Sequence, residues 1–378
     1  MLTRLALAAA FLVAASVTSR ALELAVAGPE RVLFDSVRDG CDAHDLPDAP
    51  ARAFRNAAGE MVLFAPNYIN RALVGPDLEH LTRDCTVRFA AAGSAVPAQL
   101  DDRTWLQAFH TDNGRDVFAF ASASFIPYRH GMLCSAGPAR TDCWYNGIAA
   151  LSSTDGGATF GYLGAPPQQI AFPPPAPYDS GVADPAGFIT ATNIVAWQGA
   201  LYTILWRRGE DGKSHNCLAR AEGGDPLRWQ VWSGTGFVPA TAFASNAWQI
   251  ATADCAAIGP KTQPVIRGLV LNEKDRTFIA VFQYRTGTSG EEHGFYYATS
   301  PDLIRWSEPS LLLATDLQAD AAPREGYAGY PSIIDETSPD RNFGTVGASA
   351  SLVFVRFVPY GQKSVRRELV SVPIRIAD

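Results

Sequence analysis

The sequence predicts an all-β protein, a five-bladed β-propeller with four-stranded blades. Short runs rich in Val, Ile, Phe, Tyr and Trp alternate with clusters of Gly, Pro, Asp and Asn, and helical periodicity is nearly absent. Pairs of apolar runs joined by a polar turn recur five times, at intervals of roughly 70 residues. A small antiparallel sheet repeated at this spacing is typical of a propeller, in which each repeat forms one radial blade.

Each predicted blade begins with a hairpin. The five hairpins read ARAFRNAAGEMVLFAP (51–66), LQAFHTDNGRDVFAFAS (106–122), NIVAWQGALYTILW (193–206), VLNEKDRTFIAVFQ (270–283) and YPSIIDETSPDRNFGTVGASASLVFVRF (330–357). The turns NAAGE, TDNGRD, WQGA and NEKDR carry the residues that tight hairpins require. A third run and a fourth, aromatic strand follow each of the first four hairpins, which completes four strands per repeat.

The two ends of the chain are expected to complete the fifth blade together. After its hairpin the fifth repeat has only ELVSVPIRIAD (368–378), and the N-terminal run ERVLFDS (30–36) has no partner. We therefore expect these runs to pair and close the ring, within a single domain over residues 28–378. A pair of β-sandwiches and a six-bladed ring remain alternative architectures.

The first 21 residues have the pattern of a secretory signal peptide. Arg4 precedes an apolar run over residues 5–17, which is too short to span a bilayer, and small residues follow it. Cleavage is expected after Ala21, or as late as Ala27, where the small-residue spacing repeats. Later stretches of about 20 uncharged residues, at 156–178, 185–206 and 230–253, are interrupted by glycine, proline and polar residues and do not form continuous apolar runs. We therefore expect a periplasmic or secreted protein without membrane insertion.

Six cysteines remain after cleavage, and none has the spacing of a metal site. An even number in an exported chain favours disulfides. Pairing between nearest neighbours closes short loops inside successive repeats, although one pair could stay free. The expected disulfides are Cys41–Cys85, Cys134–Cys143 and Cys217–Cys255.

Charge and composition limit the partners and cofactors. The net charge of −7 argues against a nucleic-acid ligand, because phosphate binding needs a basic surface. The six histidines are scattered without ligand spacing, so we expect no metal and no cofactor. A structural calcium held by channel oxygens has no fixed sequence pattern and remains an alternative. The motif GxSxG is absent, and we expect a monomer.

A polar turn in the second repeat has a recognisable pattern. The segment SSTDGGATF fits S-x-D-x-G-x-T-F with Ser153, Asp155, Gly157, Thr159 and Phe160. It resembles the Asp box of sialidases and many other propeller proteins, which is a turn between the third and fourth strands of a blade, away from substrate. The residue types also favour a turn, since an aspartate can cap the N–H groups of its own turn and glycine adopts backbone conformations that other residues rarely adopt.

The segment TSPDLIRW, with Asp302 and Trp306, resembles the related turn of five-bladed glycosidases. GPDLEHL, with Asp77, and GGDPLRW, with Asp225, are degenerate copies. Asp77, Asp155, Asp225 and Asp302 are therefore interpreted as structural turn residues. The catalytic residues are expected instead where the chain enters the innermost strands.

The densest polar cluster, CDAHDLPDAPARAF (41–54), leads into the first inner strand. It resembles the start of the first blade in arabinanase- and invertase-like glycosidases, where an aspartate activates water or attacks the sugar. Either Asp45 or Asp48 could hold that place, and His44 and Arg52 would contact the substrate. The alternative is a disulfide-tethered loop whose carboxylates pair with Arg52 and Arg55.

Three further segments enter inner strands. DDRTWLQAF offers Trp105 as a stacking platform for a sugar or as a core residue. PYDSGVADPAGFITATN offers Asn193 and Asp184, although an aspartate before proline often only forms a turn. APREGYAGYPSIID contains GYPSI, which resembles the last-blade strand of five-bladed glycosidases. Its residues expected to face the channel are Glu325, Tyr327 and Tyr330.

The sequence therefore predicts a secreted glycoside hydrolase acting on a polysaccharide or oligosaccharide. Such hydrolysis normally needs two carboxyl groups that flank the bond. We expect Glu325 as the acid, Asp48 or Asp45 as the base or nucleophile, Asp184 as an orienting group and Arg52 as a substrate clamp. One departure from the resemblance is that the glutamate acid usual in a middle blade has only one counterpart, at position 210.

Two other functions remain open. A non-catalytic glycan-binding propeller would use the same aromatic residues without a competent carboxyl pair. A sialidase-like exo-glycosidase would use Tyr327 or Tyr330 as nucleophile beside Glu325, with Arg52 and Arg71 binding the acidic sugar.

Overall fold

The computed structural model describes residues 22–132, 144–165, 167, 169–174, 178, 186–208, 214–240, 255–286, 292–317, 326–360 and 364–377. Across these residues the regular structure is β-strand, with three short 3-10 helices, η1 (Leu78–His80), η2 (Pro97–Gln99) and η3 (Pro127–His130). The prediction of an all-β protein is therefore confirmed. The expected signal peptide, the pair Cys134–Cys143, and the candidates Asp184 and Glu325 lie outside the described residues.

The strands form four hydrogen-bonded sheets, and most of their pairings are antiparallel. We divide the 12-stranded sheet at the short parallel pairing of β9 with β12, and call the resulting groups sheets 1 to 5 in chain order. Sheet 1 contains β3 (Arg52–Arg55), β4 (Met61–Phe64), β5 (Ile69–Gly75) and β6 (Thr82–Ala90). Sheet 2 contains β7 (Arg103–His110), β8 (Val117–Phe125) and β9 (Tyr145–Ser153), with the short strands β10 (Gly161–Tyr162) and β11 (Ile170–Phe172) paired to β9. Sheet 3 contains β12 (Ala186–Ala191), β14 (Ala200–Arg208), β15 (Ser214–Glu222), β16 (Trp229–Trp232) and β17 (Phe237–Pro239), with β13 (Val195–Trp197) on β14 and β18 (Ala257–Ile258) on β15.

Sheet 4 contains β19 (Ile266–Asn272), β20 (Phe278–Thr286), β21 (Glu292–Ser300) and β22 (Ser310–Ala314), with β24 (Thr345–Val346) parallel to β19. Sheet 5 contains β23 (Tyr327–Ile334), β25 (Ser349–Tyr360) and β26 (Ser364–Ala377), together with β1 (Glu23–Val26) and β2 (Arg31–Asp35). A short parallel pairing of β9 with β12 joins sheets 2 and 3.

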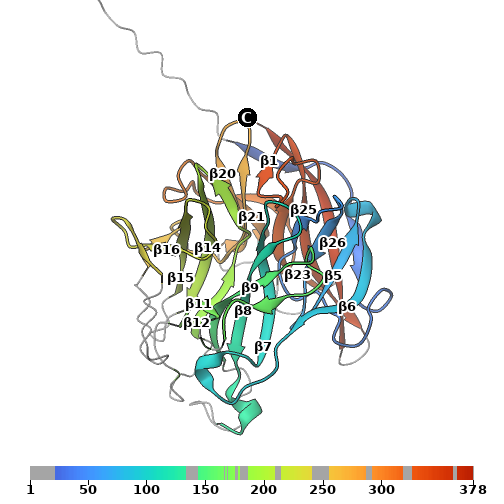
Figure 1. Cartoon of the computed structure of the whole chain (residues 1–378). Helices are drawn as coiled ribbons and strands as arrows, with labels where there is room; N and C mark the ends of the chain where they lie inside the picture. The colour runs from blue at the N-terminus through green and yellow to red at the C-terminus, as the bar shows by residue number, and fades with distance from the viewer. Residues whose placement is uncertain are drawn as a thin grey trace, which may run out of the picture.

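Five hydrophobic clusters lie between successive sheets, and the last of them joins sheet 5 to sheet 1. Aromatic pairs mark four of the seams, with ring centroids 4.7–5.1 Å apart: Phe64 with Phe109, Phe120 with Trp229, Trp197 with Phe278, and Phe295 with Phe354. At the fifth seam Met61 and Val355 are fully buried in one cluster. Figure 1 shows the red strands β25 and β26 beside β5 of sheet 1. The order of contacts is therefore cyclic, and each sheet forms its hydrophobic core by packing against the two sheets next to it.

Both N-terminal strands pair antiparallel with the final strand, β26. Glu23 of β1 lies opposite Ala377, and Arg31 of β2 lies opposite Ser371. Figure 1 accordingly shows the C-terminus beside β1. The run over residues 30–36 thus finds its partner in the final run of the chain, and β1 adds a strand before residue 28. Cleavage of a leader after Ala27 would remove β1.

Two expected disulfides are confirmed among the described residues. Cys41–Cys85 ties the loop before β3 to β6, and Cys217–Cys255 ties β15 to the segment before β18. Each closes a loop of about 40 residues within one part of the chain, as nearest-neighbour pairing requires.

The aspartate turns join the third and fourth strands of their sheets. The carboxylate of Asp155, between β9 and β10, accepts hydrogen bonds from the Thr159 N–H at 3.0 Å, the Thr159 hydroxyl at 2.6 Å and the Ser153 hydroxyl at 2.6 Å. Asp77, Asp225 and Asp302 likewise accept backbone N–H groups of their own turns. Gly157 has φ +83°, and a Cβ there would lie 2.5 Å from the ring of Phe54, so only glycine fits.

Replacing Asp155 by alanine is expected to lower the free energy of unfolding by about 1 kcal/mol at neutral pH, since the exposed turn loses its capping group. Partial burial acts to raise the pKa of Asp155, but the hydrogen bonds from Ser153 and Thr159 outweigh it and lower the pKa to about 2. The carboxylate therefore stabilises the fold fully above its ordinary pKa, and this contribution is lost as pH falls toward 2. Urea unfolding of both proteins at pH 7 and pH 3 measures the difference, which should shrink at pH 3. Asp112→Ala, at a side chain 93% exposed, is the control and should change little at either pH.

Candidate functional site

The two aspartates that the sequence left as alternatives lie in different surroundings. Asp45 is 3% exposed, and its carboxylate binds the guanidinium of Arg83 at 3.0 Å and the N–H of Cys41 at 3.1 Å. The Arg83 guanidinium also lies over the ring of Phe34, 4.3 Å from its centroid. Asp45 is thus held in a buried ion pair within the disulfide-tethered loop.

Asp48 lies instead at a meeting point of sheets 1, 2 and 5. Its Oδ1 accepts hydrogen bonds from the Arg367 guanidinium and, at 3.5 Å, from the hydroxyl of Tyr330. Burial raises the pKa of Asp48, although Arg367 and hydrogen bonds from Trp105 and Tyr330 act to lower it. The side chain nevertheless keeps 24% of its surface exposed, so a ligand can reach it. A carboxyl group with a raised pKa in an accessible position is a candidate for acid–base chemistry.

We call Asp48, Trp105, Arg267, Tyr330 and Arg367 the Asp48 cluster. Each of the four side chains around Asp48 is only partly buried. They come from β7, β19, β23 and β26, and Asp48 itself comes from the loop before β3. The cluster therefore depends on four sheets being assembled around the same point.

Tyr330 reaches the cluster through an unusual backbone conformation. Its φ is +58°, which is rare for a residue with a side chain, and Pro331 follows it. The pairing of β23 with β25 shifts register between Gly329 and Ser332, and the Tyr330 N–H is donated to Gln283 Oε1 at 3.1 Å. Burial and the neighbouring Asp48 raise the pKa of the Tyr330 hydroxyl, so it stays protonated and donates to Asp48. Strained backbone of this kind is typical of functional sites.

Aromatic side chains extend the cluster. Trp105 meets Tyr68 edge to face with centroids 6.2 Å apart, and the Arg103 guanidinium lies 4.6 Å from the centre of the Tyr68 ring. The exposed His44 contacts the Tyr68 hydroxyl through Nδ1 at 3.3 Å. Such amphipathic rings offer flat surfaces with polar edges, which suit the faces of sugar rings.

Tyr327 has a less direct position. Its ring stacks on Phe357 with centroids 4.5 Å apart, and Tyr330 contacts the same phenylalanine at 6.1 Å. The Arg367 guanidinium lies 4.8 Å from the centre of the Phe357 ring. Tyr327 thus supports the side chains that reach Asp48.

Arg52 is a buried arginine that contacts several sheets. It is 2% exposed, and its guanidinium donates to the carbonyls of Ala51, Ala191 and Arg267, which belong to sheets 1, 3 and 4 or the segments entering them. Burial, followed by repulsion from Arg267, lowers the pKa of Arg52 to about 9. Among the described residues no carboxylate lies within ion-pair distance of it. Arg52 therefore links three sheets through backbone carbonyls.

Two other expected contacts to substrate are engaged within the protein. Arg71 binds Asp42 at 2.6 Å and the Cys85 carbonyl at 3.1 Å. The amide of Asn193 accepts from the Leu269 N–H at 3.0 Å and donates to the Leu269 carbonyl. Arg71 thus holds the loop before β3, and Asn193 joins sheet 3 to sheet 4.

Sequence reasoning missed Arg267, Arg367 and Tyr68. Arg267 sits at the start of an apolar strand, and Arg367 is the second of two consecutive arginines in β26. Only the assembly of the sheets brings them near Asp48, so no local pattern identifies them. An arginine within an otherwise apolar inner strand is the one signal that could have pointed to Arg267.

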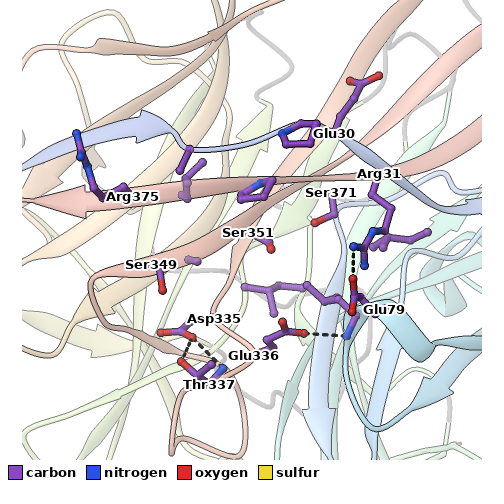
Figure 2. A pocket seen from close by; sticks show the side chains of 18 residues that line it. Glu30, Arg31, Glu79, Asp335, Glu336, Thr337, Ser349, Ser351, Ser371 and Arg375 are labelled. Carbon is purple, nitrogen blue, oxygen red and sulfur yellow. Dashed lines mark hydrogen bonds and ion pairs between the residues drawn. The ribbon is translucent and has the colours of Figure 1, made fainter.

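A separate groove of about 620 Å³ lies at the seam of sheets 5 and 1, lined by residues of β2, β23, β25 and β26. Figure 2 shows contacts to neighbouring groups for four of its charged side chains, Arg31, Glu79, Asp335 and Glu336. Arg31 forms an ion pair with Glu79, and Glu336 accepts the N–H of Leu78 at 2.9 Å. These contacts tie sheet 5 to η1 of sheet 1.

Within the described part of the chain, His215, Cys217 and Cys255 form the one group with metal-ligating atoms close together, and its two cysteines form a disulfide. None of the helices in the described part is long or apolar enough to cross a membrane.

The sequence matches no protein-family model and no curated protein sequence. Its structure is similar to an N-acetylgalactosamine deacetylase from F. plautii in complex with blood group B trisaccharide, with 12% identity, 93% of this chain and 96% of that chain covered, and a TM-score of 0.51. It is also similar to the catalytic domain of a GH62 α-L-arabinofuranosidase from Coprinopsis cinerea, with 10% identity, 93% and 96% covered, and a TM-score of 0.49. An endo-arabinase from Bacteroides thetaiotaomicron has 13% identity, 88% and 97% covered, and a TM-score of 0.47. At such identities the likeness to the deacetylase concerns the fold.

Proposed function

We propose that the protein is an exported glycoside hydrolase that cleaves a polysaccharide or oligosaccharide at the Asp48 cluster. The single observation that carries this proposal is the Asp48 carboxyl group, which is partly exposed, has a raised pKa, and touches Tyr330 and Trp105. A general base or nucleophile of a glycosidase needs a carboxyl group of this kind beside surfaces that hold a sugar.

The architecture in this proposal is a five-bladed β-propeller. Sheets 1 to 5 would be its blades, since hydrophobic clusters join them in a cycle. Pairing of β2 with β26 would close the ring. The centre of such a ring is where the loops of all blades converge, which is where ligands usually bind.

The roles follow from these positions. Asp48 would act as base or nucleophile, and Tyr330 would hold it through a hydrogen bond. Glu325, two residues before β23, would be the acid, and Asp184, two residues before β12, an orienting group. A sugar ligand is also in keeping with the trisaccharide bound to the similar deacetylase. The disulfides favour an oxidising, extracellular or periplasmic setting.

A sialidase-like mechanism is less well supported. Its tyrosine nucleophile must lose a proton, whereas burial and Asp48 raise the pKa of Tyr330. Arg71, one of the arginines that would hold the acidic sugar, is bound to Asp42.

Release of reducing sugar from a panel of neutral and acidic plant and microbial glycans tests the proposal. Wild type should release sugar from at least one glycan, and Asp48→Asn and Glu325→Gln should release far less from it. A non-catalytic glycan-binding protein would bind a glycan in the same panel and release nothing, which would overturn the proposal.

Replacing Arg367 by glutamine is expected to move the acidic limb of the pH profile to higher pH. Arg367 lowers the pKa of Asp48 against the effect of burial, so its removal should raise that pKa further. A base or nucleophile must be ionised, and the limb of kcat/KM reports the pKa of the free enzyme. The profile is measured on the best glycan from the panel.

Arg366→Gln is the matched control for this profile. Arg366 precedes Arg367 on β26 but binds Asp35 at 3.4 Å and Glu368 at 2.6 Å. The acidic limb of the Arg366→Gln profile should coincide with that of wild type. An unmoved limb in Arg367→Gln would show that Asp48 is not the titrating group.

A further inference from the structure

Arg267 is a cation that the described part of the protein leaves without a partner. No carboxylate of the described residues lies within ion-pair distance of it, and its buried Nε has no hydrogen-bond partner there. Its guanidinium lies 5.3 Å from the centre of the Tyr330 ring, on the edge of the Asp48 cluster. Arg267 as a whole residue is only partly buried.

A second cation lies directly beside it. Arg52, which is 2% exposed, donates to the backbone carbonyl of Arg267, and its own buried Nε also has no partner among the described residues. The two positive charges repel each other, and burial disfavours both. Two neighbouring cations, one buried and one partly buried, cost folding free energy unless an anion offsets their charge.

Asp48 does not supply that anion. Its carboxylate binds Arg367, whose charge it offsets. Tyr330 contacts Asp48 through its hydroxyl and Arg267 through the face of its ring. Among the described side chains at this point, Arg52 and Arg267 are therefore two neighbouring cations without a carboxylate partner. Arginine binds planar or tetrahedral oxyanions through two parallel N–H donors, which makes it the usual partner of carboxylate and sulfate groups.

We propose that the Asp48 cluster binds a sugar that carries an anionic group, a carboxylate or a sulfate ester, and that the Arg267 guanidinium binds this group. The inference rests on the proposed function for the sugar part of the ligand, and adds the chemical class of that sugar. Trp105 and Tyr330 would hold the ring while Arg267 binds the charge. Arg52, behind Arg267, would strengthen the attraction without touching the ligand.

Calorimetric titration with matched ligand pairs tests this inference. One pair is a galacturonate oligosaccharide and its carboxyl-reduced form, and the other is a sulfated galactan oligosaccharide and its desulfated form. In wild type at least one charged form should bind roughly 10- to 100-fold more tightly than its neutral partner, as a charged hydrogen bond predicts. The pair that shows the difference identifies the anion. Equal binding of charged and neutral forms in both pairs, or binding of neither charged form, would overturn the inference.

Variants then assign the effect to one residue. Arg267→Gln should lose the preference for the charged form, and Arg267→Lys, which keeps the charge, should retain part of it. Arg228→Gln removes the same charge from a turn where the side chain is 85% exposed, and should keep the full preference. Thermal unfolding checks that the variants are folded. A full preference in folded Arg267→Gln would also overturn the inference, and if that variant is unfolded, an absent preference in folded Arg267→Lys would do so.

The outcome separates the two proposals. Tight binding of a charged oligosaccharide without release of sugar would leave the anion site standing and reject the hydrolase. Hydrolysis of a neutral glycan with no preference for charge would support the hydrolase and reject the anion site.

Discussion

Replacing Asp48 by asparagine is expected to lower kcat/KM for glycan hydrolysis by about a hundredfold to ten-thousandfold, because asparagine can neither accept a proton nor attack the sugar. The fold should not suffer. Burial raises the pKa of Asp48, so at neutral pH the ionised carboxylate costs folding free energy that asparagine does not. The variant should therefore unfold at the same temperature as wild type or a higher one. Steady-state kinetics and thermal unfolding of the same preparation measure both effects.

Asn193→Ala serves as a control for this experiment. Asn193 was also expected to contact substrate, but its amide is bound to the backbone of Leu269. The Asn193→Ala variant should therefore have a lower free energy of unfolding and an unchanged kcat/KM. A kcat/KM in Asp48→Asn that stays within about twofold of wild type would remove Asp48 from the mechanism.

Replacing Asp45 by asparagine should lower stability and leave activity unchanged, although Asp45 lies only three residues before Asp48. Arg83 would keep its buried charge and lose its carboxylate partner, and breaking a buried ion pair in this way costs about 3–5 kcal/mol. We expect the free energy of unfolding to fall by that amount, measured by urea denaturation. The kcat/KM of the protein that remains folded should be unchanged.

Asp42→Asn is the matched control in the same loop. Asp42 also binds an arginine, Arg71 at 2.6 Å, but its side chain is 42% exposed. Water already solvates much of its charge, so the loss should stay below about 1 kcal/mol. If Asp45→Asn were no more destabilised than Asp42→Asn, the Asp45–Arg83 pair would not hold this loop.

Much of the fold could be predicted because its signals are local. The hairpin expected over 51–66 is present as Arg52–Arg55 paired with Met61–Phe64 around the turn at Asn56. The aspartate turns lie between third and fourth strands, because capping of a turn uses only residues within it. Cys41–Cys85 and Cys217–Cys255 were also predictable, since near neighbours close the shortest loops.

The candidate site was harder to predict because it is assembled from distant segments. Asp45 and Asp48 are indistinguishable in sequence, and only Arg83 on one side and Arg367 on the other separate them. Arg367 lies 319 residues from Asp48, so no pattern within a window links them. Arg52 was expected to clamp substrate, whereas its three carbonyl partners come from segments far apart in the chain.

The pairing of β2 with β26 can form only late in biosynthesis, after the last strand has been made. The partners Arg31 and Ser371 are separated by roughly 340 residues. At a synthesis rate of roughly 5–20 residues per second, β2 leaves the ribosome roughly 20–70 s before its partner. Through that interval β1 and β2 have no strand to bind, and the apolar residues of β1 and β2, such as Leu24 and Phe34, lack the clusters that finally bury them. The nascent protein must therefore keep both strands from pairing with other chains until the last strand is made.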